Sequence, residues 1–157
     1  MRATPDGWPR ISASLFYDDP KRAIDWLCNA FGFELRLLVE TGDGGVAHSE
    51  LVFGEGVVMV SAASKHADAR SPMHGGGTQG LMVYVDDIAA HCERARKNGA
   101  RVFQELSVSD YGEEFWSDRH YGAFDCEGHR WWFSERIATG NPTWSKVRNR
   151  RERHAHE

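Results

Sequence analysis

Residues 11–17 alternate between apolar and polar side chains, the period of a β-strand. One side of this predicted strand consists of Ile11, Ala13, Leu15 and Tyr17, and the other of Ser12, Ser14 and Phe16. The run Asp18-Asp19-Pro20 then provides an acidic cap and a first-turn proline, and apolar residues recur at helical spacing as far as Gly32. Three further strands are predicted over 33–39, 46–53 and 57–61.

The same order of elements begins again about 68 residues later. A strand over 81–85 leads through Asp86-Asp87 into a second helix that closes near Gly99, and strands follow over 101–106, 119–124 and 129–134. This irregular alternation of helices and strands argues against a doubly wound parallel sheet. It predicts an α+β fold in which two βαβββ modules form one cupped mixed sheet with the helices on its convex face.

The single domain is therefore expected over 9–136. Module 1 spans about 9–63, module 2 about 79–136, and the residues from 137 to 157 form a polar, basic tail. Residues 64–78 are rich in glycine and predict a flexible linker. Residues 107–117 predict a loop whose Tyr111, Phe115 and Trp116 either pack back on the protein or cover a pocket.

Composition narrows the functional classes. The net charge of −4 argues against a nucleic-acid partner, and no apolar run is long enough to cross a membrane. Three cysteines and the absence of a signal-like start predict a cytoplasmic protein with reduced thiols. The basic residues of the tail are interpreted as a solvated terminus.

The alternation of each strand also predicts which side chains enter the cup. These are aromatic residues with a few polar groups, the usual lining of a site for an organic ligand. The predicted lining consists of Ser12, Ser14, Phe16, His48, Glu50, Met82, Tyr84, Arg130 and Trp132, with Trp116 added from the aromatic loop. Because Trp131 and Trp132 are adjacent on a strand, they must point to opposite faces, and Trp131 is assigned with Phe133 to the helix side.

Four segments in this order resemble the vicinal oxygen chelate superfamily, which includes glyoxalase I, the bleomycin-resistance proteins and the extradiol dioxygenases. They are YDDPKRAIDWLCNAFGFE, AHSELVFGEGVVMVS, YVDDIAAHCERARKNGARV and DCEGHRWWF. The resemblance implies the fold predicted above and a homodimer that completes the cup. It does not specify one activity, because the superfamily hosts many chemistries on one scaffold.

The resemblance also implies four metal-ligand positions, one on each of four strands. They fall on Ser12, Glu50, Gly80 and Trp132, of which Glu50 alone is a good ligand for a divalent metal. The sequence therefore predicts no cofactor, with a divalent metal as the alternative.

Three functions are consistent with these residues. The first is a metal-free protein that binds a planar small molecule by stacking on Trp132, with Glu50 free to meet a ligand cation or N–H donor. The second is a lyase, isomerase or dioxygenase-type enzyme that uses Glu50 and His48, where burial would raise the pKa of Glu50. The third is a protein whose cup is filled by its own aromatic side chains and which acts through its dimer surface. An ordinary polar pair on a half-exposed face also explains His48 and Glu50.

Overall fold

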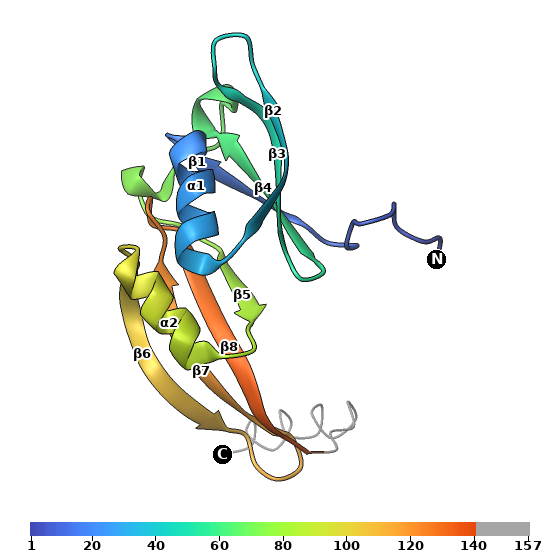
Figure 1. Ribbon diagram of the computed structural model, residues 1–157, viewed down its shortest axis with the longest axis vertical. Helices are drawn as coiled ribbons and strands as arrows, with labels where there is room; N and C mark the ends of the chain where they lie inside the picture. Colours follow the sequence, from blue (N-terminus) through green and yellow to red (C-terminus); the bar gives the residue numbers. More distant parts are fainter. Residues whose placement is uncertain (141–157) are drawn as a thin grey trace, which may run out of the picture.

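A computed structural model describes residues 1–140 of the chain. Its elements follow the predicted order in both halves (Figure 1). Module 1 consists of β1 (Ala13–Tyr17), α1 (Pro20–Phe31), β2 (Glu34–Glu40), β3 (Val46–Phe53) and β4 (Gly56–Ala62). Module 2 consists of β5 (Gly80–Tyr84), α2 (Ile88–Lys97), β6 (Arg101–Asp110), β7 (Trp116–Phe124) and β8 (Arg130–Thr139).

The two modules have the same strand topology. The strand orders are β1-β4-β3-β2 and β5-β8-β7-β6, with the first pair of each sheet parallel and the other pairs antiparallel. The predicted α+β fold of two βαβββ modules is thereby confirmed. Within residues 1–140, however, the strands form two separate four-stranded sheets and not one continuous sheet, because β1 and β5 are both edge strands without a partner on their outer side in this part of the chain.

Local sequence sets both helices. The side chains of Asp19 and Asp87 accept hydrogen bonds from the backbone N–H groups of Arg22 and Ala90, which caps the N-termini of α1 and α2. Gly32 ends α1 in the left-handed conformation at φ 81°, which a residue without a β-carbon adopts at little cost. The predicted helix boundaries are confirmed at these positions.

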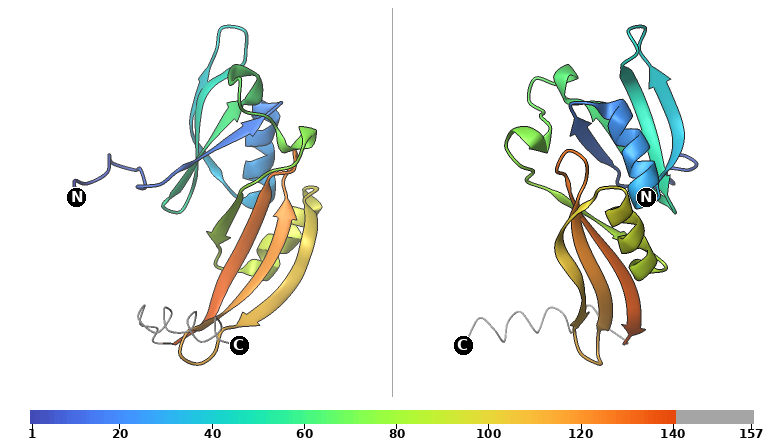
Figure 2. Two further views of the ribbon diagram at one scale, coloured as in Figure 1. Left: turned by 180° about the vertical axis from the view of Figure 1, so that it is seen from behind. Right: turned by 60° about the vertical axis from the view of Figure 1, so that its left-hand side comes forward.

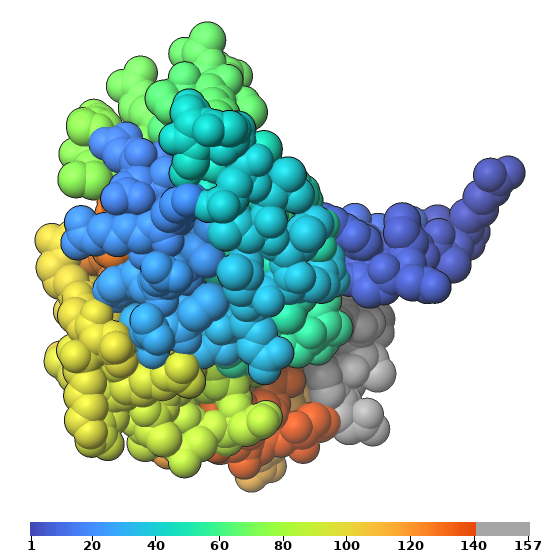
Figure 3. Space-filling view, turned by 45° about the horizontal axis from the view of Figure 1, so that its top comes forward, coloured from blue at the N-terminus to red at the C-terminus, as the bar shows by residue number. Residues whose placement is uncertain are grey.

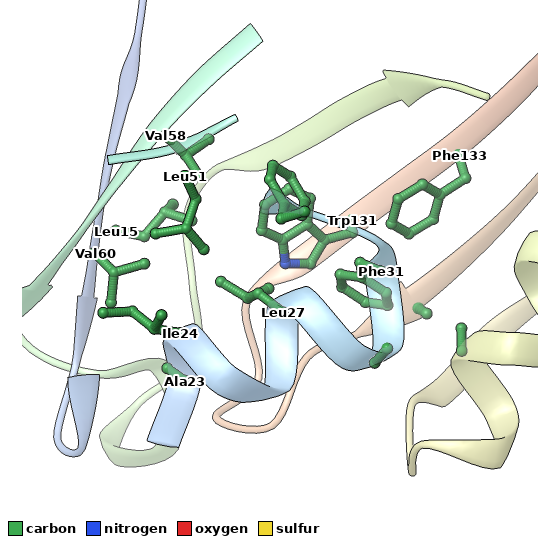
Figure 4. Packing of buried hydrophobic residues seen from close by; sticks show 14 of the residues in the cluster. Leu15, Ala23, Ile24, Leu27, Phe31, Leu51, Val58, Val60, Trp131 and Phe133 are labelled. Carbon is green, nitrogen blue, oxygen red and sulfur yellow. The ribbon is translucent and has the colours of Figure 1, made fainter. Parts of the chain in front are cut away.

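The core lies where the helices meet the inner faces of the two sheets. Figure 4 shows Phe31, at the end of α1, directed toward Trp131 and Phe133 of β8. The ring centroids lie 5.5 Å and 4.7 Å away, and all three side chains are fully buried. Burying a side chain of this size contributes about 1.5–3 kcal/mol. One aromatic cluster therefore joins the two modules.

A buried carboxylate in the turn between β7 and β8 also joins the modules. Asp125 accepts hydrogen bonds at Oδ1 from the backbone N–H groups of residues 127–129, at 3.0–3.1 Å. Its Oδ2 accepts from the Tyr17 hydroxyl of module 1 at 2.6 Å and from Trp131 Nε1 at 3.0 Å. All five donors are satisfied by one side chain that is 7% exposed.

Glu127 in the same turn binds the start of α1 and the linker. Its Oε1 accepts from the backbone N–H of Asp19 at 2.9 Å, and its Oε2 accepts from that of Asp18 and from the Ser71 hydroxyl, both at 2.7 Å. Asp125, Glu127 and these partners are called the junction below. Because Ser71 is fully buried in it, the expectation of a freely flexible linker is wrong at that point.

Two further expectations are corrected by the structure. Residues 107–117 do not form a loop, since β6 continues to Asp110 and β7 begins at Trp116, which leaves a short turn (Figure 2). The tail does not begin at 137, because β8 extends to Thr139 by pairing with the start of β7. The basic residues expected in the tail lie outside the described residues.

The N-terminal segment projects from the side of module 1, as Figure 3 shows. Among the residues that the structure describes, no helix is long and apolar enough to cross a membrane.

Candidate functional site

Each sheet has one face covered by its helix and one open face. On module 1 the buried residues Ser49 and Leu51 point into the core, so their neighbours His48 and Glu50 lie on the open face. On module 2 Trp131 and Phe133 are fully buried, which places Arg130 and Trp132 on the open face. The predicted sides of both tryptophans are therefore confirmed.

Glu50 is the centre of a polar cluster on module 1. Its Oε1 lies 3.0 Å from His48 Nε2, and its Oε2 accepts a hydrogen bond of 2.7 Å from Arg36 Nε on the neighbouring strand. The side chain is 12% exposed. The same Arg36 guanidinium lies over the Trp8 ring at 4.9 Å and donates to the carbonyl of Gly7.

The expected rise in the pKa of Glu50 is wrong. The hydrogen bond with His48 and the charge and hydrogen bond of Arg36 lower the pKa of this carboxyl, and they outweigh the opposing effect of burial. Glu50 is therefore held ionised and already has a partner for each oxygen. Sequence reasoning missed Arg36 because β2 has a register shift between Leu35 and Leu37. The shift changes which side chains of β2 share the open face with Glu50.

Trp132 lies in an aromatic cluster on module 2. The ring of Phe103 meets it edge to face at 5.2 Å, and His120 lies at 5.8 Å from it. Phe103 can lie flat over β7 because residue 122 is glycine, where a β-carbon would come within 2.3 Å of the ring. Phe103 and its glycine were both absent from the predicted lining. The available signal was the glycine directly opposite Trp132 on β7, with an aromatic residue on the following strand, β6.

A second polar cluster lies farther along the same face. Asp118 accepts from Arg136 Nε at 2.6 Å and from the Tyr84 hydroxyl at 3.1 Å. The Arg136 guanidinium lies 4.9 Å from the Trp116 ring and 5.3 Å from the Tyr84 ring. Burial of its hydroxyl and the nearby Asp118 carboxylate raise the pKa of Tyr84. Trp116 is thus held at the start of β7, and Asp118 and Arg136 were not predicted.

Two cavities lie along the edge strands β1 and β5, and they divide the predicted lining. One, of about 660 Å³, is bordered by Ser12, Met82 and Tyr84. The other, of about 680 Å³, is bordered by Ser14, Phe16 and the linker. His48, Glu50, Arg130 and Trp132 border neither of these two cavities. The structure therefore brings the predicted residues to two open faces and two clefts, not to one cup within a single chain.

The residues at the four implied metal-ligand positions do not fit a metal. Ser12 immediately precedes β1 and Glu50 lies on β3 in module 1, whereas Gly80 and Trp132 lie on β5 and β8 in module 2. Within residues 1–140 no three His, Cys, Asp or Glu side chains are grouped so that they could hold an ion. Ser12 Oγ is buried and has no hydrogen-bond partner in this part of the chain. A lone hydroxyl of this kind is a weak metal donor.

Comparisons with known proteins agree with the topology. The family model described as the Glyoxalase/Bleomycin resistance protein/Dioxygenase superfamily matches residues 11–133. Uncharacterised proteins of Mycobacterium bovis (Mb0911c) and Mycobacterium tuberculosis (Rv0887c) are 29% identical over 127 residues, covering 78% of this chain and 80% and 72% of theirs.

Solved structures also have this topology. The crystal structure of TioX from Micromonospora sp. ML1 has a TM-score of 0.63 at 34% identity, covering 81% of this chain and 95% of that one. A member of the same superfamily from Sphaerobacter thermophilus has a TM-score of 0.64 at 19% identity, covering 81% and 97%. The second likeness concerns the fold alone.

Proposed function

Since this chain belongs to the glyoxalase/bleomycin resistance protein/dioxygenase superfamily, we propose that it binds a planar organic molecule, without a metal, by stacking on Trp132. The observation that carries this proposal is the position of Trp132. It lies on the open face with Phe103 and His120 at its sides, where the resemblance implies a metal ligand. An indole at that position replaces a donor with a stacking surface.

The binding site is proposed to be completed by a second copy of the chain. Superfamily members bind small molecules and often dimerise. Here the two open faces expose large apolar side chains, among them Leu37, Val39, Met82 and Tyr84, each more than 40% exposed. A homodimer that places module 1 of one copy opposite module 2 of another would cover both faces and enclose the ligand. A mass of one chain by light scattering at micromolar concentration would contradict this arrangement.

A second candidate function is a lyase, isomerase or dioxygenase-type reaction at His48. The contact of 3.0 Å between His48 and Glu50 favours it, because a carboxylate that orients an imidazole is a common arrangement for a general base. Under this candidate, His48→Gln abolishes turnover and leaves ligand affinity unchanged. Under the binding proposal there is no turnover to lose.

The proposal is tested in two steps. A thermal-shift screen of divalent metals and planar aromatic compounds first finds ligands, because a compound that binds only the native state raises the melting temperature. Trp132→Ala is then expected to weaken binding of a hit about threefold to tenfold, from the contribution of one aromatic stack. Trp26→Ala, which removes an indole from α1 on the covered side of module 1, serves as the control. Equal affinity of the Trp132→Ala variant and the parent would leave the self-filled cup as the better interpretation.

A further inference from the structure

The open faces of the two modules carry four arginines, and their pairing differs. Arg36 is paired with Glu50 at 2.7 Å, and Arg136 with Asp118 at 2.6 Å. The other two, Arg101 on β6 and Arg130 on β8, form no ion pair with any of the residues 1–140. Two of the four positive charges are therefore not neutralised within the described chain, although the whole chain has a net charge of −4.

These two arginines lie on either side of one aromatic residue. Arg101 pairs in register with Phe124 of β7, which pairs in register with Arg130. The guanidinium carbons lie 4.6 Å and 5.7 Å from the centre of the Phe124 ring. Arg130 also lies over the ring of Phe103 at 4.0 Å. The aromatic rings hold both guanidinium groups in place without neutralising them.

The surroundings leave Arg130 accessible. Its partner in register on β5 is Gly80, which has no side chain to cover it, and Gly80 borders the cavity of about 680 Å³. Arg130 itself is exposed. A guanidinium group that is fixed, exposed and unpaired is suited to bidentate binding of a carboxylate.

We infer that Arg101 and Arg130 form an anion-binding subsite and that the ligand is an aromatic carboxylate whose ring stacks on Trp132. The Arg130 guanidinium carbon lies 6.0 Å from the centre of the Trp132 ring. This short distance suits a carboxylate attached directly to the planar ring and leaves little room for a linker. The inference rests on the proposed stacking at Trp132 and adds the charge and chemical class of the ligand.

Three naphthalene probes of different charge, of which the carboxylate and the amide have the same planar shape, test the inference by calorimetry at pH 7.5 and low salt. They are 2-naphthoate, 2-naphthamide and (2-naphthyl)methylammonium. The carboxylate is expected to bind at least about tenfold more tightly than the amide, because charge-assisted hydrogen bonds are stronger than neutral ones. Raising the salt concentration should reduce this difference.

Arginine variants test whether Arg101 and Arg130 cause the preference for naphthoate over naphthamide. The double variant Arg101→Gln/Arg130→Gln is expected to bind naphthoate no better than naphthamide, with naphthamide binding unchanged. Arg96→Gln removes the same charge from α2, where Arg96 is paired with Glu105, and should change neither affinity.

The outcomes separate this inference from the proposed function. If the amide binds as tightly as the carboxylate, or if the double variant keeps the parent's preference for naphthoate, the anion subsite is refuted while stacking stands. If binding of naphthoate is lost in the double variant and unchanged in Trp132→Ala, the subsite stands and the stacking proposal fails. If none of the three probes binds up to its solubility limit, both are refuted.

Discussion

Replacing Asp125 with Asn should destabilise the protein more than its small change in shape suggests. Asp125 accepts from five donors with two oxygens, and an asparagine side chain has only one. If that oxygen stays with the backbone N–H groups of residues 127–129, the new amide N–H₂ faces the indole N–H of Trp131, and two donors oppose each other. The opposite orientation of the amide places its donors against the three backbone N–H groups.

The magnitude follows from these contacts. Leaving the buried Trp131 N–H without an acceptor costs about 1–3 kcal/mol, and the remaining bonds lose the strength that an ionised acceptor gives them. Part of this loss is offset because the folded state no longer buries a charge. A net loss of about 2–4 kcal/mol in the free energy of unfolding is expected. For a chain of this length, that corresponds to a melting temperature lower by about 5–15 °C.

The assay is equilibrium unfolding in urea at a fixed protein concentration, followed by circular dichroism and by tryptophan fluorescence. Asp25→Asn, an exposed position on α1, is the matched control. Tyr17→Phe should cost about 1 kcal/mol, less than Asp125→Asn, because it removes one donor and leaves the carboxylate with four. If Asp125→Asn unfolds within about 0.5 kcal/mol of the control, the junction does not hold the modules together as argued.

Two further predictions concern other parts of the core and the open face. Burial lowers the pKa of His91, whose Nδ1 accepts from the Tyr121 hydroxyl and whose Nε2 donates to the Phe31 carbonyl. The unfolded chain therefore binds this proton more readily, so the stabilisation is complete above the ordinary histidine pKa of about 6.5 and is lost progressively as pH falls below it. Urea unfolding at pH 7.5 and 5.5 should show a smaller loss on acidification in His91→Gln than in the parent, and equal losses would count against this explanation. Gly122→Ala should destabilise the protein by about 1–3 kcal/mol, because the new methyl group would lie 2.3 Å from the Phe103 ring. Gly80→Ala is the control and should be tolerated, because the nearest atom to its new methyl group lies 3.5 Å away. Similar unfolding midpoints for the two alanine variants would show that Phe103 moves aside without cost.

The parts of the fold that the sequence predicts well are those set by local patterns. The Asp-Asp pairs before both helices, Gly32 after the first, and the alternation that separates Trp131 from Trp132 each act over a few residues. The hairpin at 107–117 was not predicted, since Tyr111, Phe115 and Trp116 are interrupted by polar residues and a glycine. Its strands are held by pairing with each other and with β8, which no local pattern reveals.

The candidate site was predicted less completely for the same reason. His48 and Glu50 share a strand, so their common face follows from alternation. Arg36 reaches Glu50 from another strand through a register shift. Asp118 and Arg136 likewise meet across neighbouring strands. Partners across a sheet depend on register, and register is set by the whole sheet and not by the residues nearby.

The charges that remain unpaired on the open faces determine which ligand suits them. Glu50 has Arg36 at one oxygen and His48 at the other, so a cationic ligand would have to displace one of them. Asp118 is similarly occupied by Arg136 and Tyr84. Neither carboxylate is available, whereas Arg101 and Arg130 are not paired with any described residue. Around Trp132 the unpaired charges are therefore the positive charges of Arg101 and Arg130, opposite in sign to the net charge of the chain, and they favour a planar anion over the cation that Glu50 alone would suggest.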